Sequence, residues 1–305
     1  MNTIEQAAKR LAELRRAGVD VSGSLPAATP APTASALAPS GDRPVEDREP
    51  SPSRFGADAS GTERRSREVT LDLDRMNAWG LLIPGKERSS LEEEFRIIKR
   101  PVLENVRGNG AAKPDRANLI MVTSSVPGEG KTQTSINLAL SMAMELDHTV
   151  LLVEADVVKP SVLSRLGVAP SKGLMDLLAD KSLDLSDVLL KTNIPKLTLL
   201  PAGTASSRST ELLASGTMDA LLEELANNYS DRVIIFDSPP LLPSTESRVM
   251  ASHMGQVIMV VEAGKTPLPA IKQAFATIED HPVVLTMLNK YQGPKGSEAY
   301  GYYAP

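Results

Sequence analysis

A short loop with two glycines and a lysine lies between an apolar run and a helix-like segment. The apolar run is Leu119–Val122, the loop has the sequence SSVPGEGKT over 124–132, and the helix-like segment covers 134–145. A strand, a glycine-bearing loop ending in Lys-Thr and a helix form the phosphate-binding loop of nucleoside triphosphatases. The pattern therefore predicts that this chain binds a nucleoside triphosphate.

Each residue type in the loop suits that chemistry. Backbone N–H groups of the loop can bind phosphate oxygens, and the positive end of the helix dipole adds to their attraction. Lys131 is expected to reach the β- and γ-phosphates, and the Thr132 hydroxyl to bind Mg²⁺. The expected nucleotide contacts in this segment are Gly128, Glu129, Gly130, Lys131, Thr132 and Gln133.

Two further apolar runs end in acidic residues. Val150–Val153 is followed by Glu154 and Asp156, and Val233–Phe236 is followed by Asp237. Because ligands bind at the carboxyl ends of parallel strands, Asp156 and Asp237 are predicted to hold Mg²⁺ together with the loop threonine. Glu154 and Asp156 alternate along the chain and should point to different sides, so one can face the metal or the nucleophile. The alternative is that these acids only cap the turns that follow.

These residues require a scaffold of alternating strands and helices. The apolar runs are continuous, which is typical of a parallel sheet covered on both faces. We therefore expect an α/β fold, a doubly wound, mostly parallel sheet of the P-loop NTPase type with helices on both faces. The expected strands are Leu119–Thr123, Thr149–Val153, Leu197–Leu200, Arg232–Phe236, Gln256–Val261 and Val283–Leu288. The expected helices are Thr134–Glu145, Leu174–Ala179, Ser186–Lys191, Glu211–Asn228, Ser244–His253 and Pro269–Glu279, with another that begins at Ser90 as N-cap.

The remaining chain divides by composition. Residues 1–20 include a short amphipathic helix at Ile4–Ala17, and 21–70 are rich in Pro, Ala and Ser. Such a segment buries too little apolar surface to offset its ordering entropy, so a disordered linker is expected there. The folded domain is expected over 71–290, and 291–305 is expected to be a flexible tail.

Bulk composition excludes several classes of function. The 305 residues contain no cysteine and carry a net charge of −5, which argues against thiol chemistry, disulfides and nucleic-acid binding. No run reaches the roughly 20 apolar residues of a membrane span. We therefore expect a cytoplasmic protein that reaches a membrane only through a partner.

The tyrosines are concentrated at one end. Four of the five fall in the last fifteen residues, at Tyr291, Tyr300, Tyr302 and Tyr303. Their alternative interpretation is a disordered tail without consequence. Exposed aromatic residues are sparse in such polar tails, which favours a functional role.

The motifs SSVPGEGKT, LLVEADVVKPS and VIIFDSPPLL together resemble the Walker A, A′ and B motifs of the bacterial tyrosine kinases of capsule and exopolysaccharide synthesis. The resemblance covers about Leu91 to the C-terminus and is strongest to the exosortase-linked subgroup. It implies an ATP-dependent protein-tyrosine autokinase that uses Mg²⁺ and phosphorylates its own tail at Tyr300, Tyr302 and Tyr303. It also implies control of exopolysaccharide production and export.

The resemblance implies further roles and partners. Lys131, Glu154, Asp156 and Asp237 would be catalytic, with Glu154 orienting or deprotonating the tyrosine. Glu93, Arg96 and Lys99 would form subunit contacts in a ring, and Asn289 would contact adenine. The implied partners are a membrane polysaccharide co-polymerase as activator and a cognate tyrosine phosphatase. The chain departs from the family pattern at Glu154, where Asp is usual, and at Lys99, where Arg is usual.

Two rival functions remain open at this point. One is an ATP-driven switch like the ParA and MinD ATPases, which share this fold but carry an extra lysine early in the loop. Here the corresponding segment, Ser124–Pro127, has none. The other is a scaffold that binds ATP without catalysis and organises polysaccharide export.

Overall fold

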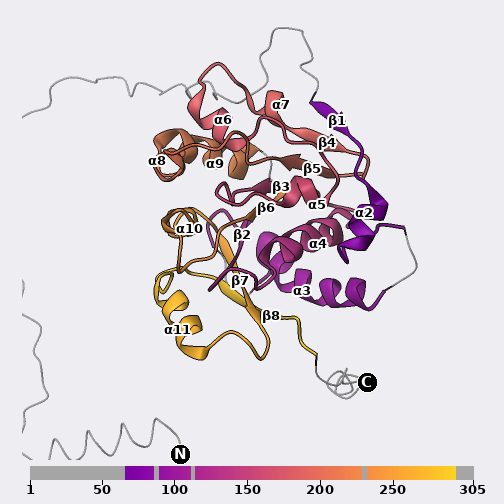
Figure 1. Ribbon diagram of the computed structural model, residues 1–305, viewed down its shortest axis with the longest axis vertical. Helices are drawn as coiled ribbons and strands as arrows, with labels where there is room; N and C mark the ends of the chain where they lie inside the picture. Colours follow the sequence, from indigo (N-terminus) through magenta and orange to yellow (C-terminus); the bar gives the residue numbers. More distant parts are fainter. Residues whose placement is uncertain (1–65, 86–88, 111–113, 229–231, 293–305) are drawn as a thin grey trace, which may run out of the picture. The chain divides into compact units, whose positions relative to one another are not determined.

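The structure is a computed structural model that describes residues 66–85, 89–110, 114–228 and 232–292. The described residues form an eight-stranded sheet with the order β1-β4-β5-β3-β6-β2-β7-β8 (Figure 1). Neighbouring strands are parallel except β4 and β5, which are antiparallel. The strands are β1 (Arg67–Val69), β2 (Leu119–Ser124), β3 (Thr149–Glu154), β4 (Leu190–Thr192), β5 (Leu197–Leu200), β6 (Arg232–Asp237), β7 (Gln256–Glu262) and β8 (Val284–Asn289).

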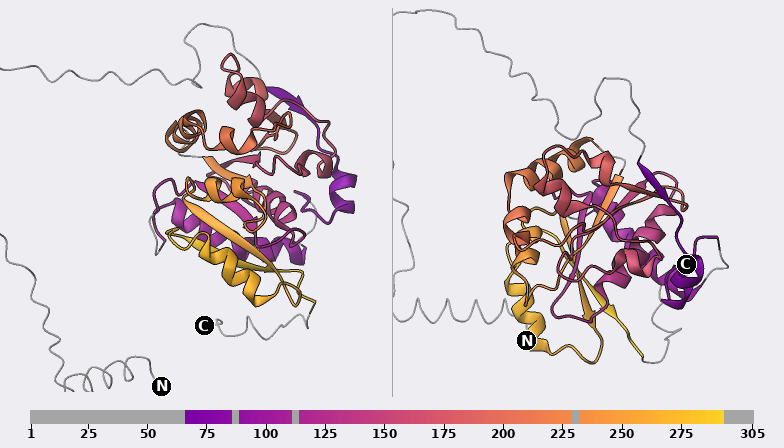
Figure 2. Two further views of the ribbon diagram at one scale, coloured as in Figure 1. Left: turned by 60° about the vertical axis from the view of Figure 1, so that its left-hand side comes forward. Right: turned by 45° about the horizontal axis from the view of Figure 1, so that its top comes forward.

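Helices cover both faces of this sheet, as Figures 1 and 2 show. One face packs on α2 (Leu73–Ala78), α3 (Ser90–Val106), α4 (Lys131–Ala143) and α5 (Val162–Arg165). The other packs on α6 (Leu174–Ala179), α7 (Leu185–Val188), α8 (Ser209–Leu213), α9 (Gly216–Asn228), α10 (Thr245–Ala251) and α11 (Leu268–Ala276). The predicted doubly wound α/β fold is confirmed.

The central strands explain why their apolar runs are continuous. Along β2, Leu119 and Met121 belong to the core on one face, and Ile120 and Val122 belong to the core on the other. Successive side chains of a strand point to opposite faces, so a strand covered on both sides needs an apolar residue at every position. The six predicted strands are confirmed, each within one residue at either end.

Three predicted helices were wrong in extent. The expected helix Pro269–Glu279 ends three residues early, at Ala276. The expected helix Ser186–Lys191 ends at Val188, because Leu189 takes an extended conformation and Leu190 pairs with β5. The expected helix Glu211–Asn228 is divided into α8 and α9 at Ala214 and Ser215. There Ser215 Oγ accepts a hydrogen bond from the Met218 N–H at 3.3 Å and begins a new helix.

The start of two other helices also differs from expectation. Ser89, rather than Ser90, caps α3, because its hydroxyl accepts a hydrogen bond from the Glu92 N–H at 3.2 Å. Helix α4 begins at Lys131, three residues before the predicted start at Thr134. Strands β1 and β4 were not predicted, and β1 lies within the residues expected to be linker.

The strand ends that carry the acidic motifs meet at one edge of the sheet. β3 pairs with β6 so that Glu154 lies opposite Asp237, and β6 pairs with β2 so that Asp237 lies opposite Val122. The phosphate loop begins directly after β2. The topology therefore brings three motifs that are distant in the sequence to the same edge.

Candidate phosphoryl-transfer site

The loop between β2 and α4 has the backbone of an anion site. Gly128 and Gly130 have φ values of 91° and 101°, a left-handed conformation that glycine adopts without steric cost. Lys131 is the first residue of α4, so the N-terminus of that helix opens directly onto the loop. The backbone N–H groups of the loop and the helix dipole together favour a phosphate group at this position.

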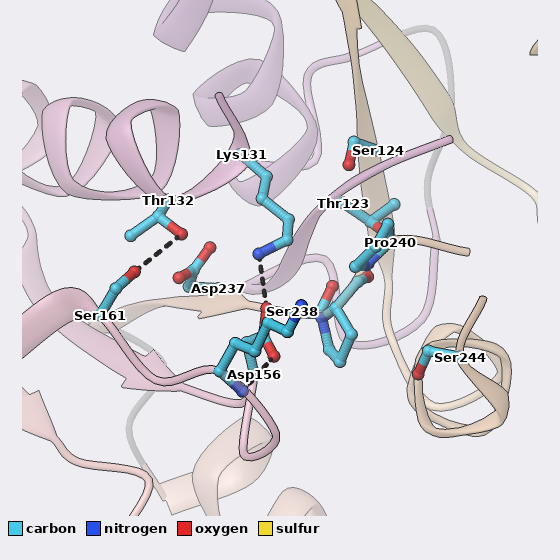
Figure 3. A network of polar contacts seen from close by, with 12 residues as sticks. Thr123, Ser124, Lys131, Thr132, Asp156, Ser161, Asp237, Ser238, Pro240 and Ser244 are labelled. Carbon is cyan, nitrogen blue, oxygen red and sulfur yellow. Dashed lines mark hydrogen bonds and ion pairs between the residues drawn. The ribbon is translucent and has the colours of Figure 1, made fainter. Parts of the chain in front are cut away.

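Lys131 and Asp156 form a buried ion pair, drawn in Figure 3. Lys131 Nζ lies 2.6 Å from Asp156 Oδ2, and only 12% and 7% of the two side chains are exposed. The other carboxylate oxygen, Oδ1, accepts a hydrogen bond from the Lys159 N–H at 3.1 Å. The loop lysine is thus held next to Asp156, which balances its charge.

Asp237 presents a buried carboxylate oxygen that lacks a hydrogen bond. Its Oδ1 accepts from Ser135 Oγ at 3.1 Å, whereas Oδ2 has no partner among the described residues. Burial raises the pKa of Asp237 to about 6, although the charge of Lys131 and the Thr132 and Ser135 hydroxyls oppose that rise. A buried carboxylate with a free oxygen is suited to receive a cation.

These residues fit a magnesium ion. Thr132 Oγ1 accepts a 3.5 Å hydrogen bond from Ser161 Oγ, and it lies beside Asp237 in Figure 3, where its hydroxyl acts to lower the pKa of that carboxyl. Mg²⁺ prefers hard oxygen ligands and is commonly held by one or two protein groups together with substrate phosphates and water. Within the described ranges, no group of three or more His, Cys, Asp or Glu residues could hold a metal without such help. Asp156, the third expected ligand, has both carboxylate oxygens engaged.

The Glu154 carboxylate, expected to orient or deprotonate the tyrosine, accepts hydrogen bonds from backbone N–H groups. Its side chain is 3% exposed, and its Oε1 accepts from the Val162 N–H at 2.5 Å. Its Oε2 accepts from the Ala202 N–H at 3.4 Å. Burial raises the pKa of this carboxyl above its ordinary value. Glu154 and Asp156 point to different sides, as their alternation predicted, and Glu154 fixes the start of α5 rather than facing Lys131.

Two loop side chains predicted to touch nucleotide bind protein groups instead. The Glu129 carboxylate is 1% exposed and accepts from the Val126 N–H at 2.7 Å and from Thr266 Oγ1 at 2.5 Å. Gln133 Nε2 donates to the carbonyls of Trp79 and Gly80 at 3.2 and 3.3 Å. Their backbone N–H groups remain the parts suited to phosphate.

Sequence reasoning missed several residues of this site. Ser135 was detectable in principle, because it lies one helical turn after Lys131 on the same face of α4. Thr266 and Lys290 carried no local signal, since their partners in the loop are 137 and 162 residues away. Asn289, expected to contact adenine, donates from Nδ2 to the Glu129 carbonyl at 2.8 Å.

The three residues expected to contact other subunits separate into two environments. Arg96 is exposed and pairs within α3 with Glu92 and Glu93, at 3.4 and 3.0 Å. Lys99 is 7% exposed, and its Nζ lies 2.8 Å from the Ser141 carbonyl oxygen and 2.6 Å from Glu145 Oε1. The expectation that Lys99 projects to a neighbouring subunit disagrees with this geometry, because its charge is satisfied inside the subunit.

We expect Lys99→Met to lower the free energy of unfolding by about 1.5–3 kcal/mol, since a largely buried charged hydrogen bond is lost. Arg96→Met is the matched control, and its exposed pairs should contribute less than about 1 kcal/mol. Urea denaturation of both variants measures the difference. If the two variants are equally stable and Lys99→Met impairs assembly, Lys99 contributes to a subunit interface and not to the stability of the single subunit.

The remaining predicted positions lie outside the described residues. These are Tyr300, Tyr302 and Tyr303 and the N-terminal segment Ile4–Ala17. Tyr291, two residues after the end of β8, is described and has 64% of its surface exposed. Among the described helices, none combines the length and the apolar character that crossing a bilayer requires.

Comparisons with known proteins show the family to which this chain belongs. A family model described as an AAA domain matches residues 117–286, more than half of the chain. Tyrosine-protein kinase YwqD of Bacillus subtilis is 32% identical over 219 residues, covering 71% of this chain and 87% of YwqD. Succinoglycan biosynthesis transport protein ExoP of Rhizobium meliloti is 28% identical over 253 residues, covering 79% of this chain and 31% of ExoP. The VpsO kinase domain is 28% identical with a TM-score of 0.54, covering 67% of this chain and all of that domain. The chain belongs to the bacterial tyrosine kinase family.

Proposed function

We propose that this protein transfers the terminal phosphoryl group of ATP to tyrosines of its own C-terminal tail, and that it does so between subunits. The observation that carries the proposal is the Lys131–Asp156 pair beside the unpartnered Oδ2 of Asp237, at the end of the phosphate loop. The tyrosine-rich tail supplies a substrate within the same chain. The family membership supports tyrosine, rather than water, as the acceptor.

In this proposal the phosphate loop positions the transferred group. N–H groups of residues 128–132 and the ammonium of Lys131 bind the phosphate oxygens, while Thr132 and Asp237 hold Mg²⁺. When bound, Mg²⁺ neutralises charge on the β- and γ-phosphates. Catalysis of this transfer depends mainly on position and charge, and these residues supply both.

Asp156 is the better candidate for the proton acceptor. A free tyrosine has a pKa near 10 and is a weak nucleophile at neutral pH. Once Lys131 binds phosphate, Asp156 Oδ2 loses its ion-pair partner at 2.6 Å and can accept the hydroxyl proton. The tyrosine oxygen then forms the new P–O bond as the bond to ADP breaks. Glu154 supports this step by fixing the loop around Asp156.

The cellular role follows from the resemblance and from the similarity to ExoP, whose name places it in succinoglycan biosynthesis transport. We propose that the protein regulates exopolysaccharide production and export. In this proposal a membrane polysaccharide co-polymerase recruits and activates it at the inner face of the membrane. Assembly into a homo-oligomeric ring brings the tail of one subunit to the site of its neighbour, and a cognate tyrosine phosphatase reverses the reaction.

We expect a mixture of two defective subunits to restore labelling. One subunit carries Lys131→Met and keeps its tail, and the other lacks residues 291–305 but keeps its site. With labelled ATP and Mg²⁺, label should appear on the Lys131→Met chain, and mass spectrometry should place it on Tyr300, Tyr302 or Tyr303. Each subunit incubated alone is the control and should remain unlabelled.

The same mixture separates the rival functions. ATP hydrolysis without any tyrosine label would favour a ParA- or MinD-like switch, and nucleotide binding without turnover would favour a scaffold. Label confined to Tyr229 or Tyr291 would contradict Tyr300, Tyr302 and Tyr303 as the acceptors. Absence of transfer between chains, with normal labelling of wild-type protein, would contradict the reaction between subunits.

A further inference from the structure

Two side chains at the end of β8 donate hydrogen bonds to carbonyl oxygens of the phosphate loop. Asn289 Nδ2 donates to the carbonyl oxygen of Glu129 at 2.8 Å, and Lys290 Nζ donates to that of Gly128 at 2.6 Å. The two carbonyls belong to successive residues of the loop, and the two donors are successive residues of the strand end. Two successive side chains therefore bind two successive peptide groups of a segment that lies 160 and 162 residues earlier in the sequence.

The orientation of those carbonyls determines where the loop N–H groups point. A trans peptide unit is planar, so the C=O of one residue and the N–H of the next point in opposite directions. The described residues contain no cis peptide bond. Holding the Gly128 and Glu129 carbonyls toward β8 therefore directs the N–H groups of Glu129 and Gly130 away from β8. Those are N–H groups that a phosphate would meet in the loop.

The end of β8 is shaped for this contact. Lys290 has a φ of 57°, a left-handed conformation that is uncommon for a residue with a side chain. Asn289 Oδ1 accepts from the Lys290 N–H at 2.9 Å, so one amide side chain bonds both the turn and the loop. A methyl group added at Gly130 would collide with Asn289 Nδ2, which shows how closely the amide packs on the loop.

A buried carboxylate ties the loop to the neighbouring strand as well. Glu129 accepts from the Glu262 N–H at 3.3 Å, at the end of β7, and from the hydroxyl of Thr266, four residues further along the chain. Glu262 Oε2 in turn lies 3.3 Å from Lys290 Nζ. The loop is thus fixed to the ends of β7 and β8 on the side away from Asp156 and Asp237.

We propose that Asn289 and Lys290 are positioning residues for the phosphate loop, aiming its N–H groups at the β-phosphate of the nucleotide. The inference rests on the proposed nucleotide site, but not on tyrosine as the acceptor. It gives Asn289 a role other than contact with adenine. The two roles differ in which part of the nucleotide they affect.

Nucleotides with and without a β-phosphate separate the two roles. We measure the Kd values of ADP and AMP by equilibrium competition with a fluorescent nucleotide, for Asn289→Ala and Lys290→Met in the full-length protein. A positioning role predicts that the Kd of ADP rises about fivefold to tenfold, the loss expected for one such hydrogen bond. The Kd of AMP should stay within about twofold, because the N–H groups concerned have no phosphate to bind.

Lys265→Met is the matched control for charge. Lys265 Nζ also lies 3.3 Å from Glu262 Oε2, but 74% of its side chain is exposed and its partner is Glu262 alone among the residues described. Its removal should leave both Kd values within about twofold.

Lys290→Arg keeps a donor and should recover part of the ADP affinity. The Lys290→Met loss should persist at 0.5 M salt, since screening weakens a through-space charge effect but not a misplaced loop.

Three results would overturn the proposal. An equal loss of ADP and AMP affinity in Asn289→Ala would make that residue an adenine contact. ADP affinity within twofold of wild type in both variants would show that the loop keeps its shape without them. Loss in Lys290→Met that disappears at high salt would reduce Lys290 to an electrostatic contribution. Thermal unfolding without nucleotide confirms that the variants are folded. If Asn289→Ala is unstable, Lys290→Met provides the test, because the Lys290 side chain is exposed.

Discussion

Lys131→Met should reduce tyrosine phosphorylation at least about a hundredfold, the range observed when one preorganised charge-stabilising donor is removed from an active site. The nucleotide-free protein should also become less stable. Lys131 is the partner of Asp156, whose side chain is only 7% exposed, and removing one member of a buried pair leaves an uncompensated charge. Labelling with ATP and Mg²⁺ measures the first effect, and urea denaturation measures the second.

Two further variants separate the stability effect from the catalytic one. The double variant Lys131→Met with Asp156→Asn removes both charges, so it should recover stability without recovering activity. Lys272→Met, on the exposed side of α11, changes the same type of residue and should affect neither. Near wild-type labelling by Lys131→Met would overturn the assignment of Lys131 to the phosphates.

Asp237→Asn should have opposite effects on activity and on stability. Activity should fall by about a hundredfold or more, because the carboxylate proposed to hold Mg²⁺ is lost. Stability without metal should rise at pH 8. Burial raises the pKa of Asp237 from an ordinary value of 3.8 to about 6 in the folded protein. Below about pH 4 the carboxyl is neutral in both the folded and unfolded states and carries no penalty.

The sign of the pH dependence follows from proton linkage. Between about pH 4 and pH 6 the folded state binds more protons at Asp237 than the unfolded state, so this group lowers stability as the pH rises through that window. Above pH 6 the penalty is complete, and two pKa units correspond to about 3 kcal/mol. Urea denaturation in EDTA at pH 4 and pH 8 should show Asp237→Asn equal to wild type at the lower pH and more stable at the higher.

An exposed aspartate provides the control for this experiment. Asp280→Asn removes a carboxylate that lies on the surface after α11, and its stability should follow wild type at both pH values. If Asp237→Asn is destabilised equally at pH 4 and pH 8, the carboxylate is ionised and stabilising in the nucleotide-free protein. That result would contradict the argument that burial disfavours the ionised form of Asp237 and leaves its Oδ2 free to bind a metal ion.

The sequence alone predicted six of the eight strands of the sheet and the motifs that follow them. Strands covered on both faces must be apolar at every position, so each long run in the chain was recognisable without any knowledge of its neighbours. The positions of Lys131, Thr132 and Asp237 also followed from the sequence, because parallel strands place their carboxyl ends at a common edge. Strands β1 and β4 have three residues each, too few to show a period.

Only the tertiary structure decided how the acidic and loop side chains are used. Their alternation along the chain indicated that Glu154 and Asp156 point to different sides. The structure shows that Glu154 contacts the start of α5, whereas Asp156 pairs with Lys131 and faces the site. The hydrogen bond of Lys290 joins residues 162 positions apart in the sequence. Such contacts depend on which strands the connections between them make neighbours in the sheet. The spacing of residues within a short segment of sequence carries no information about that arrangement. The sequence thus specifies which chemistry is available, while the fold specifies which side chain performs it.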